Sequence, residues 1–143
     1  MPHKTDMQVA LISGGTSGIG MATAELLLKQ GWCVVINGRH EKDGQRAALK
    51  LRRFSSKVRF VAGDVSKVDD CKRIVKQTVD MFGDISALVT AAGYYEEELL
   101  VDVTEQSFDE MFGTNVKGTV FLCQAALPYI RNTKGSIVTV SSD

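Results

Sequence analysis

Short apolar runs alternate along this chain with longer stretches of helical periodicity, and no other feature of the sequence constrains the fold as strongly. Each run is short and continuous, which is typical of a strand buried on both faces of a sheet. The runs cover residues 9–12, 33–36, 58–62, 85–89 and 137–140. Strands joined by helices pair in parallel with helices on both faces, because each crossover has to be right-handed. The sequence therefore predicts an α/β fold with one doubly wound parallel sheet.

Periodic apolar residues and capping signals predict the helices between these strands. Ser66 should cap the helix after the third strand, with Asp69 in the capping-box position, and Gly83 should end it. Thr104 should cap a later, long helix. The apolar residues that define the first helix are Ile19, Ala22, Leu26 and Leu27. Those expected on the buried side of the long helix are Phe108, Met111, Phe112, Val116, Val120 and Cys123.

Composition excludes several classes of protein. The 143 residues suffice for one domain, and Lys+Arg equals Asp+Glu at 17 each, so no net charge favours nucleic acid or an anionic membrane. No apolar run approaches the roughly 20 residues that span a bilayer, and the polar start lacks a secretory signal. Three scattered cysteines, Cys33, Cys71 and Cys123, fit buried thiols in a reducing compartment. We therefore expect a cytoplasmic protein without nucleic-acid or membrane partners.

A glycine-rich segment connects the first apolar run to the first helix. It reads Ser13-Gly14-Gly15-Thr16-Ser17-Gly18-Ile19-Gly20. Glycines let a backbone approach a pyrophosphate closely, and the free N–H groups and positive dipole end of the helix face the anion. No Gly-Lys-Ser/Thr sequence follows, which disfavours a nucleoside-triphosphatase P-loop. We therefore expect dinucleotide binding in a Rossmann-like sheet with strand order 3-2-1-4-5.

The end of the second strand bears on the choice of cofactor. NAD-selective sheets place an acid about 20 residues past the glycines, where it holds the ribose hydroxyls. This chain has Asn37-Gly38-Arg39-His40 there, without an acid. A guanidinium binds phosphate in a charge-assisted fork, so Arg39 favours NADP, with its 2′-phosphate, over the alternative NAD. A solvated surface arginine is the simpler interpretation.

Three further residues have both a structural and a functional interpretation. Asp64 follows the third strand and either caps the next helix or accepts a hydrogen bond from an adenine amino group; the better cap at Ser66 favours the second. Asn115 lies on the apolar side of the long helix, where a buried amide needs a partner. A helix bend or a bound water explains it, and so does a catalytic relay. Ser142 is either a rim hydroxyl or an ordinary turn residue.

Other residues that could carry chemistry have little support. His3 and His40 are isolated, so neither a metal site nor a histidine-based triad is expected. The run from Glu96 to Glu98 is expected to be a solvated loop, and Trp32 a packing residue.

Together these segments resemble the short-chain dehydrogenase/reductase family across essentially the whole chain. Residues 13–20 resemble its Thr-Gly-x-x-x-Gly-Ile-Gly signature, with serine in place of the leading threonine. The other matching segments are Asp64-Val65, Thr90-Ala91-Ala92-Gly93, Asn115-Val116-Lys117-Gly118 and residues 135–142. Thr90-Ala91 stands where the family writes two asparagines. The order and spacing of all five segments make the resemblance specific.

The resemblance implies an NAD(P)(H)-dependent oxidoreductase that interconverts a carbonyl and an alcohol by hydride transfer, and a homo-oligomer, either dimer or tetramer. It assigns catalysis to Asn115 and Ser142. The cofactor-binding residues that it implies, together with those named above, are Gly14, Thr16, Ser17, Gly18, Ile19, Gly20, Arg39, Asp64, Val65, Ala91, Ala92 and Gly93. No metal is implied.

One family feature, a Tyr-x-x-x-Lys pair, does not occur in this sequence: Glu98, Leu99 and Thr133 follow the three tyrosines at that distance. We therefore expect residues 1–143 to be the incomplete, cofactor-binding front part of a longer enzyme, inactive alone. Its fifth strand would then have an open edge that invites association. Two alternatives remain: a non-catalytic dinucleotide-binding module that regulates a partner, and a flavodoxin-like or receiver-type signalling domain. The second needs a cluster of acids, and this rim offers mainly Asp64.

Overall fold

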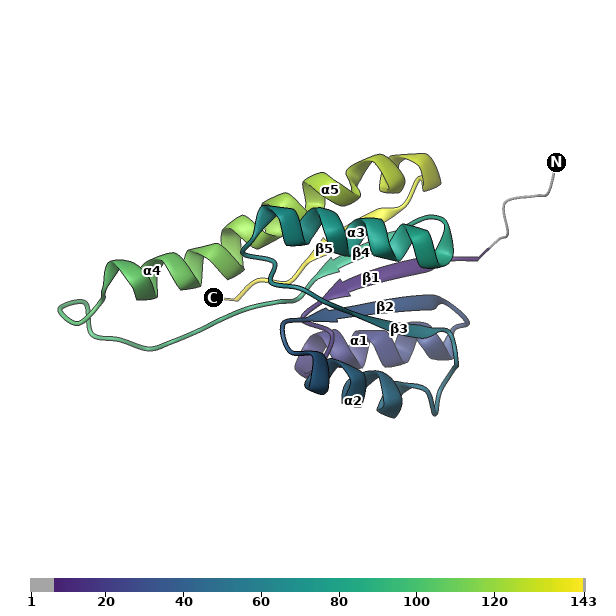
Figure 1. Ribbon diagram of the computed structural model, residues 1–143, viewed down its shortest axis with the longest axis horizontal. Coiled ribbons are helices and arrows are strands. Elements are labelled where there is room, and N and C mark those ends of the chain that lie inside the picture. The colour runs from purple at the N-terminus through teal and green to yellow at the C-terminus, as the bar shows by residue number, and fades with distance from the viewer. Residues whose placement is uncertain (1–6, 143) are drawn as a thin grey trace.

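The computed structural model describes residues 7–142, which form one five-stranded parallel sheet with helices on both faces (Figure 1). The strands are β1 (Val9–Ser13), β2 (Cys33–Gly38), β3 (Val58–Ala62), β4 (Ala87–Thr90) and β5 (Ser136–Thr139). Their order is β3-β2-β1-β4-β5, so the predicted strand order and doubly wound architecture are confirmed. β1 lies at the centre of this sheet, and the order in which the chain adds strands switches from one side of β1 to the other between β3 and β4.

The helices are α1 (Gly18–Lys29), α2 (Glu41–Leu51), α3 (Val68–Phe82), α4 (Glu105–Phe112) and α5 (Gly118–Thr133). A π-helical turn, η1 (Gly113–Lys117), joins α4 to α5. Figure 1 shows α1 and α2 on one face of the sheet and α3 and α5 on the other. We call the continuous segment of α4, η1 and α5 the long helix; its α4 end extends beyond the sheet.

Two apolar cores lie on the two faces of the sheet because successive strand residues point to opposite sides. Ile12 and Ile36 pack with the helices α1 and α2, whereas Leu11, Val35 and Leu88 pack with α3 and α5. Strands β1 and β2 are buried on both faces, which explains why each reads as an unbroken apolar run. These two cores fix the carboxyl ends of the strands relative to one another.

The predicted buried face of the long helix is wrong for four of its six residues, whereas Cys123 packs partly buried against the core. Phe108, Phe112, Val116 and Val120 are about half exposed. Buried instead are Ser107, Gly118, Leu122, Ala126 and Ile130. The π-turn changes the helical phase between α4 and α5, and α4 has no sheet beneath it to cover its apolar side chains. The predicted cap at Thr104 is confirmed, and it forms a capping box with Ser107.

The apolar residues that define helix α1 in the sequence are not the ones that are buried. Ile19 and Leu26 are exposed, whereas Gly20, Ala24 and Leu28 are buried. Small residues let the start of α1 pack closely against the turn before it, because an added Cβ at Gly20 would collide with the carbonyl oxygen of Gly14. The close approach of two backbone segments, rather than the apolar area of the side chains, determines which face of α1 is buried.

Helix α3 begins later than its sequence suggested. Its N-cap position is Lys67, without a side-chain cap, so the predicted cap at Ser66 is wrong. The hydroxyl of Ser66 binds Asp64 instead. The end of the helix at Gly83 is confirmed, with φ of 87° in the left-handed region.

Candidate functional site

A cleft of about 510 Å³ lies at the carboxyl ends of β1, β2, β3 and β4. It brings together every residue predicted above to bind the cofactor: Gly14, Thr16, Ser17, Gly18, Ile19, Gly20, Arg39, Asp64, Val65, Ala91, Ala92 and Gly93. The cleft also contains residues that the sequence analysis did not assign to it: Asn37, Gly38, His40, Asp43, Gly63, Tyr94 and Thr114. Asn115 and Ser142 do not line it.

The glycine turn is held against the turn that follows β4. Gly14 has φ of 64°, and a Cβ built there would lie 2.6 Å from the amide nitrogen of Ala92. That amide donates a hydrogen bond of 3.3 Å to Oγ of Ser13. Gly18 also has a positive φ of 53°, but an added Cβ would meet nothing within 4 Å. One glycine therefore permits close packing of two turns, and the other faces open space.

Asn37 fixes the neighbouring ends of β2 and β3. Its side chain is buried, and Nδ2 donates to the carbonyl oxygens of Val61 at 3.0 Å and Gly63 at 3.2 Å. Its own carbonyl accepts a hydrogen bond of 3.0 Å from the amide of Gly15. The sequence contains a signal for this role: Asn37 stands at the end of an apolar strand, and a buried side-chain amide needs hydrogen-bond partners.

Asp64 is not a free acceptor, which corrects the sequence-based argument for its role. Its Oδ1 accepts hydrogen bonds from the amide of Ser66 at 3.0 Å and from the hydroxyl of Ser66 at 2.7 Å. The amide of Asp64 donates to Asp70 at 2.7 Å. This hydrogen bond and the nearby Arg73 lower the pKa of the Asp70 carboxyl. The turn after β3 therefore uses one oxygen of Asp64 for its own structure.

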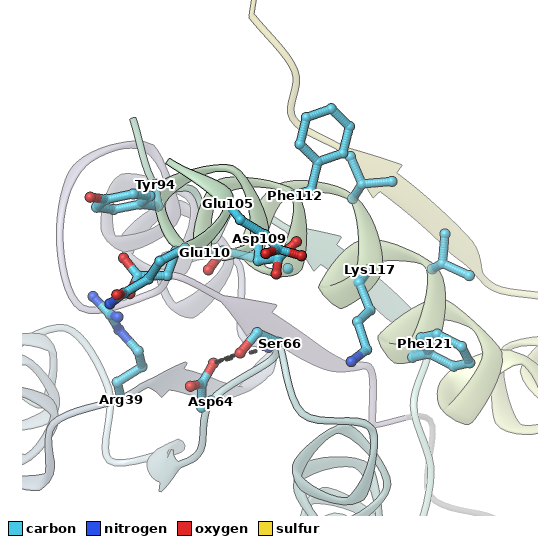
Figure 2. A pocket seen from close by; sticks show the side chains of 15 residues that line it. Arg39, Asp64, Ser66, Tyr94, Glu105, Asp109, Glu110, Phe112, Lys117 and Phe121 are labelled. Carbon is cyan, nitrogen blue, oxygen red and sulfur yellow. Dashed lines mark hydrogen bonds between the residues drawn. The ribbon is translucent and has the colours of Figure 1, made fainter. Parts of the chain in front are cut away.

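A second and larger groove, of about 1000 Å³, adjoins the cleft. In Figure 2, Arg39, Asp64 and Ser66 lie on one side of it, and the α4 carboxylates of Asp109 and Glu110 lie on the other. Arg39 is exposed and lines both hollows. Its position after β2 agrees with the predicted one, at the junction of cleft and groove.

Asn115 holds the loop after β4 in place. It lies in the π-turn and is exposed, so its predicted place on a buried helix face is wrong. Its Nδ2 donates to the carbonyl of Tyr94 at 2.7 Å, and its Oδ1 accepts from the amide of Tyr94 at 2.8 Å. The backbone carbonyl of Asn115 accepts a hydrogen bond of 3.0 Å from the hydroxyl of Thr119. Both hydrogen-bonding atoms of the Asn115 side-chain amide are therefore paired with the backbone of Tyr94.

Tyr94 and the acidic run interact with each other. The phenol of Tyr94 donates a hydrogen bond to Glu96, and this bond raises the pKa of the phenol. Glu97 is exposed, as expected of a solvated loop, but Glu96 has a specific partner. Ser142 is exposed beyond β5.

The three cysteines are free thiols in the structure. Burial raises the pKa of each, that of Cys71 to about 11.

Trp32 packs against the core beneath α1, as predicted. Residues 7–142 contain no cluster of three or more His, Cys, Asp or Glu side chains able to hold a metal ion. Within the same residues, no helix has the length and apolar character to cross a membrane. His3 lies outside the described residues.

This geometry agrees with a match to a known family. Residues 8–143 match the family described as short chain dehydrogenase. The chain belongs to this family. It is 37% identical to 11-beta-hydroxysteroid dehydrogenase A of Sesamum indicum over 137 residues, which cover 94% of this chain and 39% of that protein. It is 32% identical to an uncharacterized oxidoreductase of Staphylococcus epidermidis, covering 97% of this chain and 60% of that protein.

Solved structures of short-chain dehydrogenases share the fold. L-sorbose reductase from Gluconobacter frateurii, complexed with NADPH and L-sorbose, matches with a TM-score of 0.88 and 29% identity, over 93% of this chain and 51% of that one. The NADH-dependent reductase A1-R′, complexed with NAD, matches with a TM-score of 0.87 and 26% identity, over 95% and 60%. The present chain thus spans between 39% and 60% of the length of these proteins.

One position where this member of the family departs from the family pattern is Thr90, at the end of β4. Its hydroxyl is buried, and it has no hydrogen-bond partner among the described residues. Its neighbours in the same row of the sheet are Ser13 on β1 and Thr139 on β5. A polar row therefore crosses the sheet where the cleft begins.

Proposed function

We propose that this short-chain dehydrogenase chain is the dinucleotide-binding part of an oxidoreductase that interconverts a carbonyl and an alcohol, with NADP preferred over NAD. The observation that carries the proposal is the cleft, where the glycine turn, the end of β2 and the two turns after β3 and β4 converge. Relatives with bound NADPH or NAD share this fold. The nicotinamide ring supplies hydride transfer when the dinucleotide is bound.

The residues of the cleft fit a pyrophosphate. Ser17 has extended backbone at the N-cap of α1 and no side-chain cap hydrogen bond, so amides of the first turn remain available to an anion. Gly18 faces open space, which lets a ligand approach the backbone. Gly14 and Gly20 hold the turn in this position by their close contacts. Thr16 and Ile19 complete this wall.

The end of β2 supports a phosphate rather than an acid beside the adenosine ribose. A Cβ at Gly38 would lie 2.7 Å from Cγ2 of Thr16, so an acidic side chain there would displace its neighbour. Arg39, the next residue, offers a guanidinium for a 2′-phosphate. Asp64 and Val65 would flank the adenine, and residues 91–93 would lie along the opposite wall of the cleft.

Two residues are proposed to serve catalysis. Ser142 would orient the substrate oxygen, because it follows β5 on the same edge of the sheet. Asn115 would act as a positioning residue, since its two hydrogen bonds fix Tyr94 at the mouth of the cleft. The proposed assembly is a cytoplasmic homo-oligomer.

Arg39→Ala tests the cofactor proposal. Binding of NADPH and NADH to the purified protein is measured by calorimetry. Loss of a charge-assisted hydrogen bond worth about 1.5–3 kcal/mol should weaken NADPH binding at least about tenfold and leave NADH within about twofold. Arg53→Ala is the matched control, because Arg53 stacks over Phe54 away from the cleft.

Equal losses for NADPH and NADH would overturn the preference for NADP. Binding of neither dinucleotide to the unsubstituted protein would overturn the proposed function as a whole.

A further inference from the structure

Two hollows meet at Asp43, on the first turn of α2. One is the cleft, and the other is a smaller cavity of about 260 Å³ between the glycine turn and α2. Asp43, Thr16 and Ser17 line both. Arg46 and Lys50, one and two turns further along α2, line the smaller cavity only. Asp43 therefore borders the cleft that Arg39 also borders, and two bases of the same helix border the cavity next to it.

Asp43 is held loosely. Its Oδ1 lies 3.8 Å from Nη1 of Arg46, and the two side chains are 61% and 70% exposed, so the pair is weak and open to a competing anion. Glu41, the other acid in this turn, accepts a hydrogen bond from Gln45 at 2.8 Å. His40 provides no side-chain cap for the helix. The positive end of α2 thus attracts negative charge, and Asp43 supplies that charge next to the cleft.

Among the groups of a dinucleotide, the 2′-phosphate is the one whose binding these charged residues should affect most. A phosphate monoester carries about −1.5 to −2 charges at pH 7. Arg39 attracts it, and the carboxylate of Asp43 repels it. Arg46 offsets that repulsion by pairing with Asp43, and it places a second guanidinium in the cavity that shares Asp43 with the cleft. A ribose with free hydroxyls carries no charge, so the same residues hardly affect it.

We propose that Asp43 and Arg46 determine how strongly the cleft prefers a 2′-phosphorylated ribose, with Asp43 lowering the preference and Arg46 raising it. The proposal rests on the proposed function, because it presupposes that the adenosine end of a dinucleotide lies beside Arg39. It adds Asp43 and Arg46 to Arg39, the residue that the sequence indicates for binding the 2′-phosphate.

The test compares adenosine 2′,5′-bisphosphate with adenosine 5′-monophosphate, and NADPH with NADH, as ligands of the purified protein in calorimetry. Asp43→Asn should tighten binding of both 2′-phosphorylated ligands about three- to fivefold, and Arg46→Gln should weaken it by a similar factor. The ligands without a 2′-phosphate should change less than about twofold. Because the charges are exposed, both effects should shrink as salt is raised from about 0.05 to about 0.5 M.

Asp69→Asn is the control variant, since Asp69 is an exposed acid in the first turn of α3 and lines neither hollow. If Asp69→Asn gave the same gain, the effect would be one of net charge and the proposal would be wrong. If the unsubstituted protein bound dinucleotides and Asp43→Asn changed both classes of ligand equally or neither, this inference alone would fail. If the unsubstituted protein bound no dinucleotide, the proposed function would fail together with it.

Discussion

The glycine turn and the long helix differ in what covers them. At the turn, backbone meets backbone so closely that Gly14 and Gly20 have no room for a side chain. Along the outer face of the long helix, Phe108 and Phe112 stack on each other with centroids 4.3 Å apart and remain half exposed. The turn follows β1, the central strand of the sheet, whereas α4 extends beyond the sheet (Figure 1). Position relative to the sheet, rather than apolar character, decides which surface is buried.

The contrast also appears within one helix. In α5, Leu122 is fully buried against the sheet, but Val120, two residues before it, is 54% exposed. Strand β5 repeats the pattern on the same side of the molecule, because Val138 is exposed as well. The sheet centre is thus completely packed on both faces, and the region of α4, η1 and β5 is packed on one.

The largest expected effect is at Leu122. Leu122→Ala should lower the free energy of unfolding by about 2–5 kcal/mol, because it removes a buried side chain and leaves a cavity. Urea unfolding followed by circular dichroism measures it. Val120→Ala on the exposed face is the matched control and should cost less than about 1 kcal/mol. Equal costs at the two positions would show that the outer face is covered in solution, and the comparison would no longer hold.

An intermediate effect is expected at Gly20. Alanine is normally the better helix former, but here its Cβ would collide with the carbonyl oxygen of Gly14. Gly20→Ala should therefore destabilise the fold by about 1–3 kcal/mol, as overpacking does. Gly93→Ala is the control, since its nearest neighbour, Oδ1 of Asn115, would lie at an ordinary 3.6 Å. A stabilised Gly20→Ala variant in the same urea titration would refute the close packing of the turn.

The smallest effect concerns the turn after β3. The amide of Asp64 and the guanidinium of Arg73 lower the pKa of Asp70 below its ordinary value of 3.8. A lowered pKa in the folded state stabilises the protein above that value, and the contribution is lost as the pH falls below it. Asp70→Asn should cost about 1 kcal/mol at neutral pH, as for one hydrogen bond. The difference between variant and parent should then shrink as the pH falls through the lowered pKa of Asp70.

The check is to measure the free energy of unfolding of the parent and of Asp70→Asn between about pH 7 and about pH 2. Asp69→Asn, which removes the adjacent exposed carboxyl, should retain the acid-dependent loss of the parent protein. A gap between Asp70→Asn and the parent that stayed constant down to the lowest pH would contradict the assigned hydrogen bond.

The sheet and the cleft were predictable from the sequence for one geometric reason. Parallel strands gather their carboxyl ends at one edge, so residues that follow strands, such as Arg39 and Ala92, had to meet once the alternation was recognised. The helix faces were not predictable in the same way. Periodicity shows which side chains share a face, but Phe112 and Val116 share one that no other element covers. A local turn also altered the phase, because η1 inserts a π-helical segment at Asn115.

By itself, the sequence determined the order of the elements, the parallel sheet and the glycine turn, because backbone conformation and strand burial are encoded locally by residue type and spacing. The tertiary structure alone decided that Asn115 binds the backbone of Tyr94, that Oδ1 of Asp64 accepts a hydrogen bond from Ser66, and that Asp43 borders the cleft. In each contact, the distance between the two residues depends on how the helices and loops pack against the sheet. The residue pattern of a single segment does not specify this distance.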